Sequence, residues 1–191
     1  MSAANAQEAA ADVDTSGVVE MFQGEADAPL TVIEYASFTC PHCADFAEDQ
    51  AVKIKRDFVD TGKVKFISRD VYFDRYGLWA SMIARCDPQR YFGVKELIYA
   101  QQREWIGSGQ DPVQIANNLR KIGKTAGLSE ERLDQCLNDQ ESAEELVAWF
   151  QQNMEEHDIS GTPSLVIGDE LVENQTYEKL KAIIEEKLAA Q

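Results

Sequence analysis

Apolar residues along the chain first follow a strand-like pattern and then a helical one. Short apolar runs over residues 30–37 and 64–68 predict two buried strands. Between them, from Pro41 to about Gly62, apolar positions recur at helical spacing. Pro41 suits the first turn of a helix, where the N–H that proline lacks is not needed. The order of strand, helix and strand predicts a βαβ unit with a right-handed crossover.

The middle of the chain, residues 73–154, carries almost no strand signal. Its apolar residues recur at helical spacing and are interrupted at Asp87-Pro88, around Gly107 and Gly109, and after Gly123. Such spacing and such breaks predict a layer of four or five helices.

The C-terminal part returns to strands. Residues 164–167 and 171–173 predict a tight hairpin, and an amphipathic helix follows over residues 177–188. The complete order predicts an α/β, thioredoxin-like fold with an inserted all-helical subdomain. We expect residues 1–17 to form a disordered N-terminal tail. Residues 18–72 and 155–191 should form the two parts of the thioredoxin-like domain, and residues 73–154 the helical insertion between them.

The chemistry is concentrated where the first strand meets the first helix, in Cys40-Pro41-His42-Cys43. Disulfide exchange needs an attacking thiolate and a second thiol that resolves the mixed disulfide. Unpaired N–H groups and the helix dipole at a helix N-terminus favour a thiolate there and lower its pKa. We therefore expect Cys40 to be the nucleophile, Cys43 the resolving thiol and His42 a group that tunes the pair.

Two motifs, Cys-x-x-Cys and Thr162-Pro163, each allow a second interpretation. Cys-x-x-Cys is also half of a zinc site, which Cys86 and Cys136 would have to complete, but both lie in helical patterns and not on paired knuckles. The strand before Cys40 and the long helix after it favour redox chemistry, and no metal or cofactor is predicted. Thr162-Pro163 directly precedes a strand and is read either as a cis-proline loop or as an ordinary entry into the strand.

Composition excludes several functions and leaves the redox one. The 34 acidic and 18 basic residues give a net charge of −16, which argues against binding to nucleic acid or to anionic lipid. Four cysteines are too few for a fold that depends on dense disulfides. Ala4-Asn5-Ala6 before Gln7 resembles a signal-peptidase cleavage site, although an ordinary alanine-rich tail explains it equally well.

Two segments resemble the DsbA family of bacterial thiol:disulfide oxidoreductases. Residues 32–43 (VIEYASFTCPHC) resemble the family's strand and active-site motif, and residues 159–168 (ISGTPSLVIG) resemble its cis-proline loop. The resemblance implies that Cys40 attacks, that Cys43 is buried, and that Thr162 and Pro163 pack on the disulfide and contact substrate backbone. Thr162 departs from the best-known enterobacterial members, which carry valine, and is shared with thioredoxins and isomerases.

The resemblance also implies partners and a cellular location. It predicts a periplasmic monomer that oxidises unfolded or reduced polypeptides and is reoxidised by a DsbB-like membrane quinone reductase. Glu34 matches an acidic position behind the family's active site, where it is either a proton shuttle or a strand carboxylate that is simply hydrogen-bonded or solvated.

Cys86 and Cys136 have no ligand-like neighbours in the sequence. They either remain separate buried thiols or form a disulfide, as in some related DsbA proteins, which would contribute about 4 kcal/mol by closing its loop. Competing functions are an isomerase or reductase of the same fold and a non-catalytic binding or holdase domain. The helical insertion also resembles that of kappa-class glutathione transferases, which lack the paired cysteines.

Overall fold

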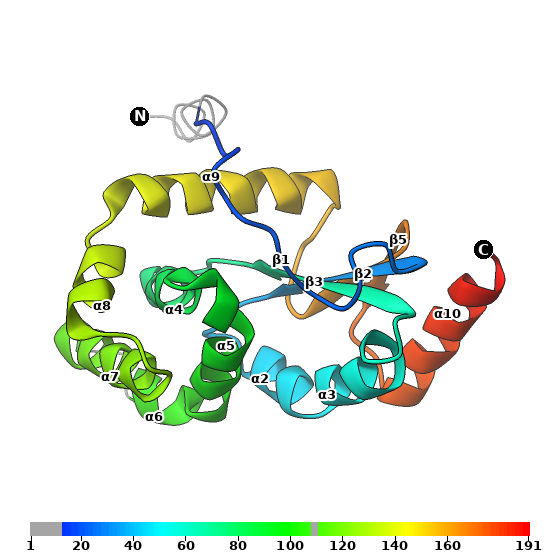
Figure 1. Cartoon of the computed structure of the whole chain (residues 1–191), viewed down its shortest axis with the longest axis horizontal. Coiled ribbons are helices and arrows are strands. Elements are labelled where there is room, and N and C mark those ends of the chain that lie inside the picture. Colours follow the sequence, from blue (N-terminus) through cyan, green and yellow to red (C-terminus); the bar gives the residue numbers. More distant parts are fainter. Residues whose placement is uncertain (1–12, 108–110) are drawn as a thin grey trace.

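The computed structural model describes residues 13–107 and 111–191 of the chain (Figure 1). Its centre is a five-stranded sheet in the order β1-β3-β2-β4-β5, in which β2 and β3 are parallel and the other neighbours are antiparallel. The thioredoxin-like fold class with inserted helices is confirmed. The strands are β1 (Met21–Gln23), β2 (Leu30–Ala36), β3 (Val64–Asp70), β4 (Ser164–Ile167) and β5 (Glu170–Glu173).

One face of the sheet is covered by the helices that follow β2 and by the C-terminal helix α10 (Tyr177–Ala189) (Figure 1). The single helix predicted after β2 is divided into α2 (Pro41–Glu48), α3 (Gln50–Ile54) and a π-helical turn, Lys55–Val59. The division falls at Asp49, whose φ of −115° departs from the usual helical value. Apolar side chains from both sides fill this layer, among them Val32, Phe46, Phe58, Leu165, Leu180 and Ile184.

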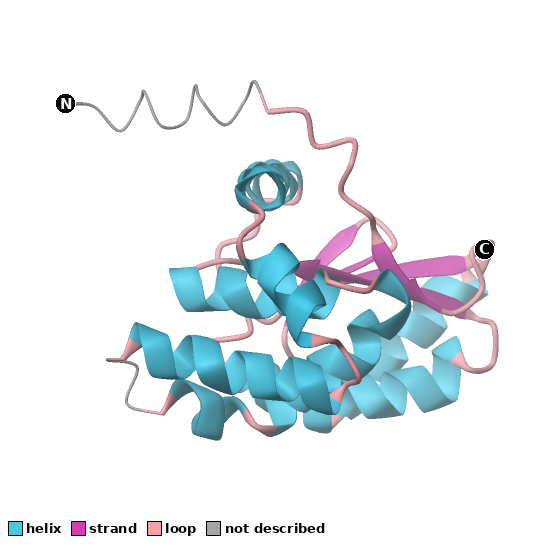
Figure 2. Ribbon diagram, turned by 60° about the vertical axis from the view of Figure 1, so that its left-hand side comes forward, coloured by secondary structure: helices cyan, strands magenta, loops and turns pink. Residues whose placement is uncertain are grey.

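The inserted helices gather beside the sheet, on the left of Figure 1, and Figure 2 shows them turned toward the viewer. Their shared core contains Trp105, Leu119 and Ile83, all buried. At the start of three of these helices a side chain accepts backbone N–H bonds, as Asp74 does from Tyr76 and Gly77, which satisfies groups that a helix end leaves open. The helices are α4 (Arg75–Arg85), α5 (Tyr91–Ala100), α6 (Gln102–Ile106), α7 (Pro112–Thr125) and α8 (Glu130–Leu137), with a 3-10 turn at Pro88–Arg90.

The long helix α9 (Gln140–Glu156) lies on the opposite face of the sheet (Figure 1). Phe150 and Met154 of this helix pack against Tyr35 and Val166 of the sheet. The sheet is therefore covered on both faces. Within the part of the chain that the structure describes, no helix has the length and apolar character needed to cross a membrane.

Part of the predicted N-terminal tail lies against this helix. Thr15 Oγ1 donates a hydrogen bond to Gln152 of α9 over 3.1 Å. The predicted cleavage site at Ala4-Asn5-Ala6 and the rest of residues 1–12 lie outside the described residues.

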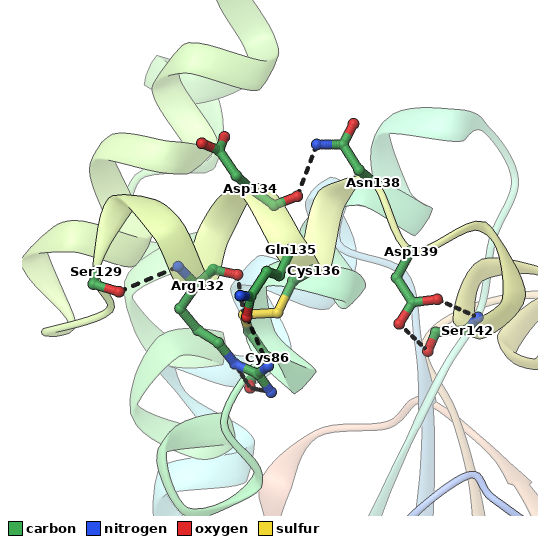
Figure 3. Close-up of a disulfide and its surroundings, with 9 residues drawn as sticks. All are labelled: Cys86, Ser129, Arg132, Asp134, Gln135, Cys136, Asn138, Asp139 and Ser142. Carbon is green, nitrogen blue, oxygen red and sulfur yellow. Dashed lines mark hydrogen bonds between the residues drawn. A yellow bond between two sulfur atoms is a disulfide. The ribbon is translucent and has the colours of Figure 1, made fainter.

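A disulfide joins Cys86, at the C-terminal end of α4, to Cys136 in α8, and their Cα atoms are 5.7 Å apart (Figure 3). Next to it, the guanidinium of Arg132 donates two hydrogen bonds to the carbonyl of Cys86, over 3.1 and 2.8 Å. The bond and the guanidinium hold the same two helices together at one point. Of the two interpretations that the sequence leaves open for these cysteines, the structure has the paired one.

Candidate active site

Cys40 lies at the turn between β2 and α2, at the N-cap position of the helix, with Pro41 in the first turn. Its backbone is extended, with φ −85° and ψ 119°. The thiol of Cys40 is partly exposed, whereas Cys43, one turn into the helix, is completely buried. The two cysteines of the pair thus differ in access: a partner protein can reach the first sulfur and not the second.

This setting moves the pKa values of the two thiols in opposite directions. A hydrogen bond from Cys43 contributes most to lowering the pKa of Cys40 from its usual 9.0 to about 5, and the backbone N–H groups of Cys43 and His42 add to it. Burial of Cys40 opposes this shift. The pKa of Cys43 is strongly raised, first by its hydrogen bond to Cys40 and then by burial. Near neutral pH, Cys40 is therefore a thiolate and Cys43 a thiol.

The two residues between the cysteines are exposed. The imidazole of His42 is 81% exposed, and its Nδ1 lies 4.0 Å from a carboxylate oxygen of Asp45. The contribution of His42 to the pKa of Cys40 comes through its backbone N–H. The ring itself faces solvent.

The predicted proline loop lies against the reactive sulfur. The Thr162–Pro163 peptide bond is cis, and Pro163 is buried at the entry to β4. The Cys40 thiol lies 3.5 Å from the carbonyl oxygen of Thr162. Oγ1 of Thr162 is buried and has no hydrogen-bond partner among the described residues. The structure thus brings together Cys40 and Thr162, which are 122 positions apart in the sequence.

The active-site loop is held by two side chains from the inserted helices. Gln102 of α6 donates from Nε2 to the carbonyls of Phe38 and Cys40, both over 2.9 Å. Thr39 donates to Asp74, the residue that caps α4, over 2.8 Å. The two bonds from Gln102 satisfy backbone acceptors that a buried loop would otherwise leave unpaired, and the Thr39 bond ties the turn to the start of α4. Neither contact was predicted, since a glutamine and an aspartate at these positions carry no distinctive sequence signal.

Glu34 is completely buried on β2, and the ammonium of Lys95 donates to its Oε2 over 2.5 Å. Lys95 is buried as well, with 8% of its side chain exposed. The sequence analysis named Glu34 and missed Lys95. A signal was present: Tyr91, Lys95 and Ile98 fall on one face of α5 at helical spacing, so Lys95 lies on the buried stripe of its helix.

Tyr99 connects this ion pair with the cysteines. Its ring lies 5.1 Å from that of Phe38, and the side chain is buried. Burial is the main cause that raises the pKa of Tyr99. The ammonium of Lys95 lies 5.9 Å from the centre of the Tyr99 ring, so Tyr99 lies beside both the ion pair and the active-site loop.

A small cavity of about 60 Å³ opens beside the same groups. It is lined by Glu34, Lys95 and Tyr99 on the inside, by Ala47 of α2, and by Lys55 nearer the surface. One water needs roughly 10–15 Å³ of such space, so the cavity can hold several. Glu34 forms part of its inner wall and is itself completely buried.

A four-cysteine zinc site is not formed in this structure. Cys86 and Cys136, which would have to complete it, are bonded to each other. Across residues 13–107 and 111–191, no group of three or more His, Cys, Asp or Glu side chains is arranged to hold a metal ion.

Comparison with known proteins identifies the family. The family described as Thioredoxin matches residues 16–186. The chain belongs to the thioredoxin family. Disulfide bond formation protein D of Bacillus subtilis is 29% identical over 175 residues, which cover 86% of this chain and 75% of that protein. Relatives from Rickettsia species, named as protein-disulfide oxidoreductases, are 27 to 29% identical, and the chain spans only 61 to 64% of their length.

Solved structures of this family share the architecture, including the inserted helices. The crystal structure of α-DsbA1 from Wolbachia pipientis has a TM-score of 0.80 and 24% identity, with 90% of this chain and 92% of that chain covered. A protein-disulfide isomerase from Novosphingobium aromaticivorans has a TM-score of 0.80 and 25% identity, with 88% and 97% covered. The resemblance to the DsbA family is confirmed, and the names of the similar solved structures include both DsbA and protein-disulfide isomerase.

Proposed function

We propose that this chain is a thiol:disulfide oxidoreductase that works as a DsbA-like dithiol oxidase and donates a Cys40–Cys43 disulfide to reduced polypeptides. One observation carries the proposal: a partly exposed Cys40 whose pKa is lowered to about 5 stands beside a buried Cys43 whose pKa is raised. A stable Cys40 thiolate favours the reduced form of the pair, so the disulfide form readily accepts electrons.

The reaction follows from which sulfur is accessible. A substrate thiolate attacks Sγ of Cys40, the Cys40–Cys43 bond breaks, and Cys43 leaves and takes up a proton. A second substrate thiolate then attacks the substrate sulfur of the mixed disulfide and releases Cys40 as a thiolate. The substrate gains a disulfide and loses two electrons, which the chain keeps as one thiolate and one thiol.

The remaining site residues have supporting roles in this proposal. Thr162 and Pro163 contact the substrate backbone beside the reacting sulfur, and His42 tunes the pair. Glu34 exchanges the proton of Cys43 with solvent, a role supported by the cavity that Glu34 and Lys95 line. If Glu34→Gln leaves the exchange rate unchanged, the shuttle role is wrong.

Partners and location are part of the proposal. The substrates are unfolded or reduced exported polypeptides, and a DsbB-like membrane quinone reductase reoxidises the pair. The chain works as a monomer in the periplasm, where disulfides persist; the Cys86–Cys136 bond is consistent with such a compartment. N-terminal sequencing of the protein purified from its natural source tests the export, and an uncleaved alanine-rich tail would contradict it.

The direction of electron flow is tested by the redox equilibrium of Cys40–Cys43 with glutathione. An oxidase requires an oxidising equilibrium, whereas a value near that of thioredoxin would overturn the proposal. The alternative, an isomerase, is favoured by Thr162 and by the name of the Novosphingobium structure. Reactivating a client with scrambled disulfides faster than oxidising the same client in reduced form would identify an isomerase.

A further inference from the structure

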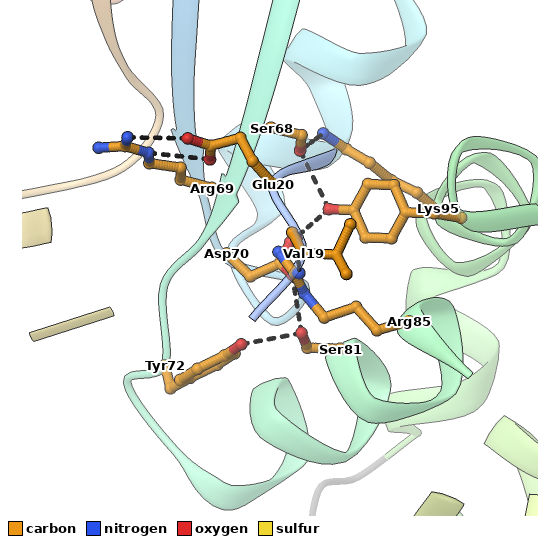
Figure 4. Close-up of polar contacts among 10 residues, drawn as sticks. Val19, Glu20, Ser68, Arg69, Asp70, Tyr72, Ser81, Arg85 and Lys95 are labelled. Atoms are coloured by element: carbon orange, nitrogen blue, oxygen red, sulfur yellow. Dashed lines mark hydrogen bonds and ion pairs between the residues drawn. The ribbon is translucent and has the colours of Figure 1, made fainter. Parts of the chain in front are cut away.

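A buried line of polar side chains begins at Lys95 and runs between β3 and the helices α4 and α5. The ammonium of Lys95 donates to Ser68 Oγ over 2.6 Å, and Ser68 Oγ lies 3.1 Å from the hydroxyl of Tyr91. Tyr91 donates to Asp70 Oδ1 over 2.6 Å. Figure 4 shows Lys95, Ser68 and Asp70 in this order. All four side chains are buried, and none is part of the reaction described above.

The hydrogens in this line can point in only one direction. An ammonium only donates, so Ser68 accepts from Lys95. The single hydrogen of the Tyr91 hydroxyl goes to Asp70, so Ser68 must donate its own hydrogen to the oxygen of Tyr91. Every hydrogen therefore points from Lys95 toward Asp70. Hydrogen bonds aligned in this way polarise one another, and each strengthens the next.

Asp70 is firmly held at the far end of the line. Its Oδ2 accepts from Ser81 and from Nε of Arg85, both over 2.7 Å, and Arg85 also donates to the carbonyl of Val19 over 2.9 Å (Figure 4). The charge of Asp70 is thus balanced by Arg85, and its position is set by three elements. The line ends in a fixed, negatively charged anchor.

Glu34 depends on Lys95 far more than Asp70 depends on any single donor. Lys95 binds one of its oxygens, and the other, Oε1, is buried without a partner among the described residues. The orientation of the Glu34 carboxylate therefore follows the position of the Lys95 ammonium. Whatever fixes Lys95 also fixes Glu34.

We propose that Tyr91 and Asp70 are positioning residues for thiol–disulfide exchange. Through Ser68 they hold the ammonium of Lys95 against Glu34 and so keep that carboxylate aligned to exchange a proton with Cys43. This inference rests on the proposed function and on the shuttle role of Glu34 within it.

The step that depends on this alignment is the closure of the Cys40–Cys43 disulfide. In a mixed disulfide between Cys40 and glutathione, Cys43 gives its proton to Glu34 and attacks Sγ of Cys40. The Cys40–Cys43 bond forms, the bond from Cys40 to glutathione breaks, and glutathione leaves as a thiolate. Burial still raises the pKa of Cys43 in this mixed disulfide, so its thiol needs a base that takes up the proton before the sulfur attacks.

The experiment compares Tyr91→Phe with Tyr72→Phe. Tyr72 lies 2.9 Å from Ser81 Oγ, which donates to Asp70, so both tyrosine hydroxyls bond a serine within the same polar network. Only Tyr91 lies between Asp70 and Lys95. The reduced full chain is mixed with oxidised glutathione, quenched with acid at intervals, and analysed by mass spectrometry for the mixed disulfide at Cys40.

We expect the Tyr91→Phe mixed disulfide to close more slowly than that of the wild type by about threefold or more. The Tyr72→Phe variant should close at the wild-type rate, and the thiolate titration of Cys40 should be the same in all three proteins. Equal closure rates in the two variants would overturn the inference. A wild-type chain that never closes its mixed disulfide would instead overturn the proposed function.

Ser68→Ala interrupts the same line of hydrogen bonds at a second position. The double variant Ser68→Ala/Tyr91→Phe should close no more slowly than Ser68→Ala alone, because one cut already disconnects Asp70 from Lys95. Additive slowing would contradict a single line. If Tyr91→Phe does not fold, Ser68→Ala is compared with Tyr72→Phe under the same criterion.

Discussion

Acidification should remove a stabilising contribution that only the reduced chain has. Cys40 titrates with a pKa of about 5 in the folded chain and near 9.0 when unfolded. A lowered pKa stabilises the folded state above the unfolded value, and the stabilisation is lost as the pH falls through the folded one. In the oxidised chain Cys40 carries no titrating thiol, so the oxidised form should lack this pH dependence.

The magnitude follows from the same two values. At about pH 7 the folded thiol is about 99% ionised and the unfolded one about 1%. The difference corresponds to about 2.7 kcal/mol, or about half of that after a discount for the exposure of Cys40 to solvent. Between about pH 7 and pH 4, the reduced chain should therefore lose about 1 to 1.5 kcal/mol relative to the oxidised chain.

Urea unfolding of both redox forms across this pH range measures the loss, and the ultraviolet absorbance of the thiolate gives the midpoint of the titration directly. Cys40→Ser, which has no thiolate at this position, is the matched control and should show no such titration. A midpoint near 9, or an equal pH dependence in the two redox forms, would refute the explanation of the lowered pKa by the Cys43 hydrogen bond and the helix N-terminus.

Three further predictions concern stability. Replacing Cys86 and Cys136 by alanine should lower the free energy of unfolding by up to about 4 kcal/mol in urea melts, and an unchanged midpoint would mean that the bond adds nothing. Lys95→Met should cost about 3–5 kcal/mol because Glu34 is left buried without its cation, whereas a neutral effect would show that solvent replaces the ammonium. Gly24→Ala should cost more than about 1 kcal/mol by thermal unfolding, since φ is +94° and the new Cβ would lie 2.4 Å from a backbone oxygen; no loss would mean that the turn rearranges freely.

The sequence predicted those strands and helices that are long enough to show a periodic pattern of apolar residues. The strands at residues 30–37 and 64–68, the helix after Pro41 and the C-terminal hairpin each repeat their pattern over several residues. Strand β1 has three residues, too few to show a period, and was not predicted. The break at Asp49 also escaped, because neither glycine nor proline marks it.

The site was predictable to the extent that its chemistry is local. Cys40 and Cys43 share one turn of helix, so their spacing already specifies a thiol pair. Lys95 and Gln102 reach the site from helices that begin more than fifty positions later in the chain. Their contribution depends on how the inserted helices dock on the sheet. Hydrophobic periodicity identifies which face of a helix is buried, but it does not show which residues of the sheet that face will meet.

The two hydrogen bonds from Gln102 to the carbonyls of Phe38 and Cys40 have a consequence for the cooperativity of the molecule. The reactive loop belongs to one half of the chain, while the donor that completes it belongs to the inserted helices. Partial unfolding of α6 would release the loop at the same time, so the insertion cannot open as an independent foldon while the exchange site stays formed. Slow amide exchange in α6 and in the active-site turn should therefore report a single opening event.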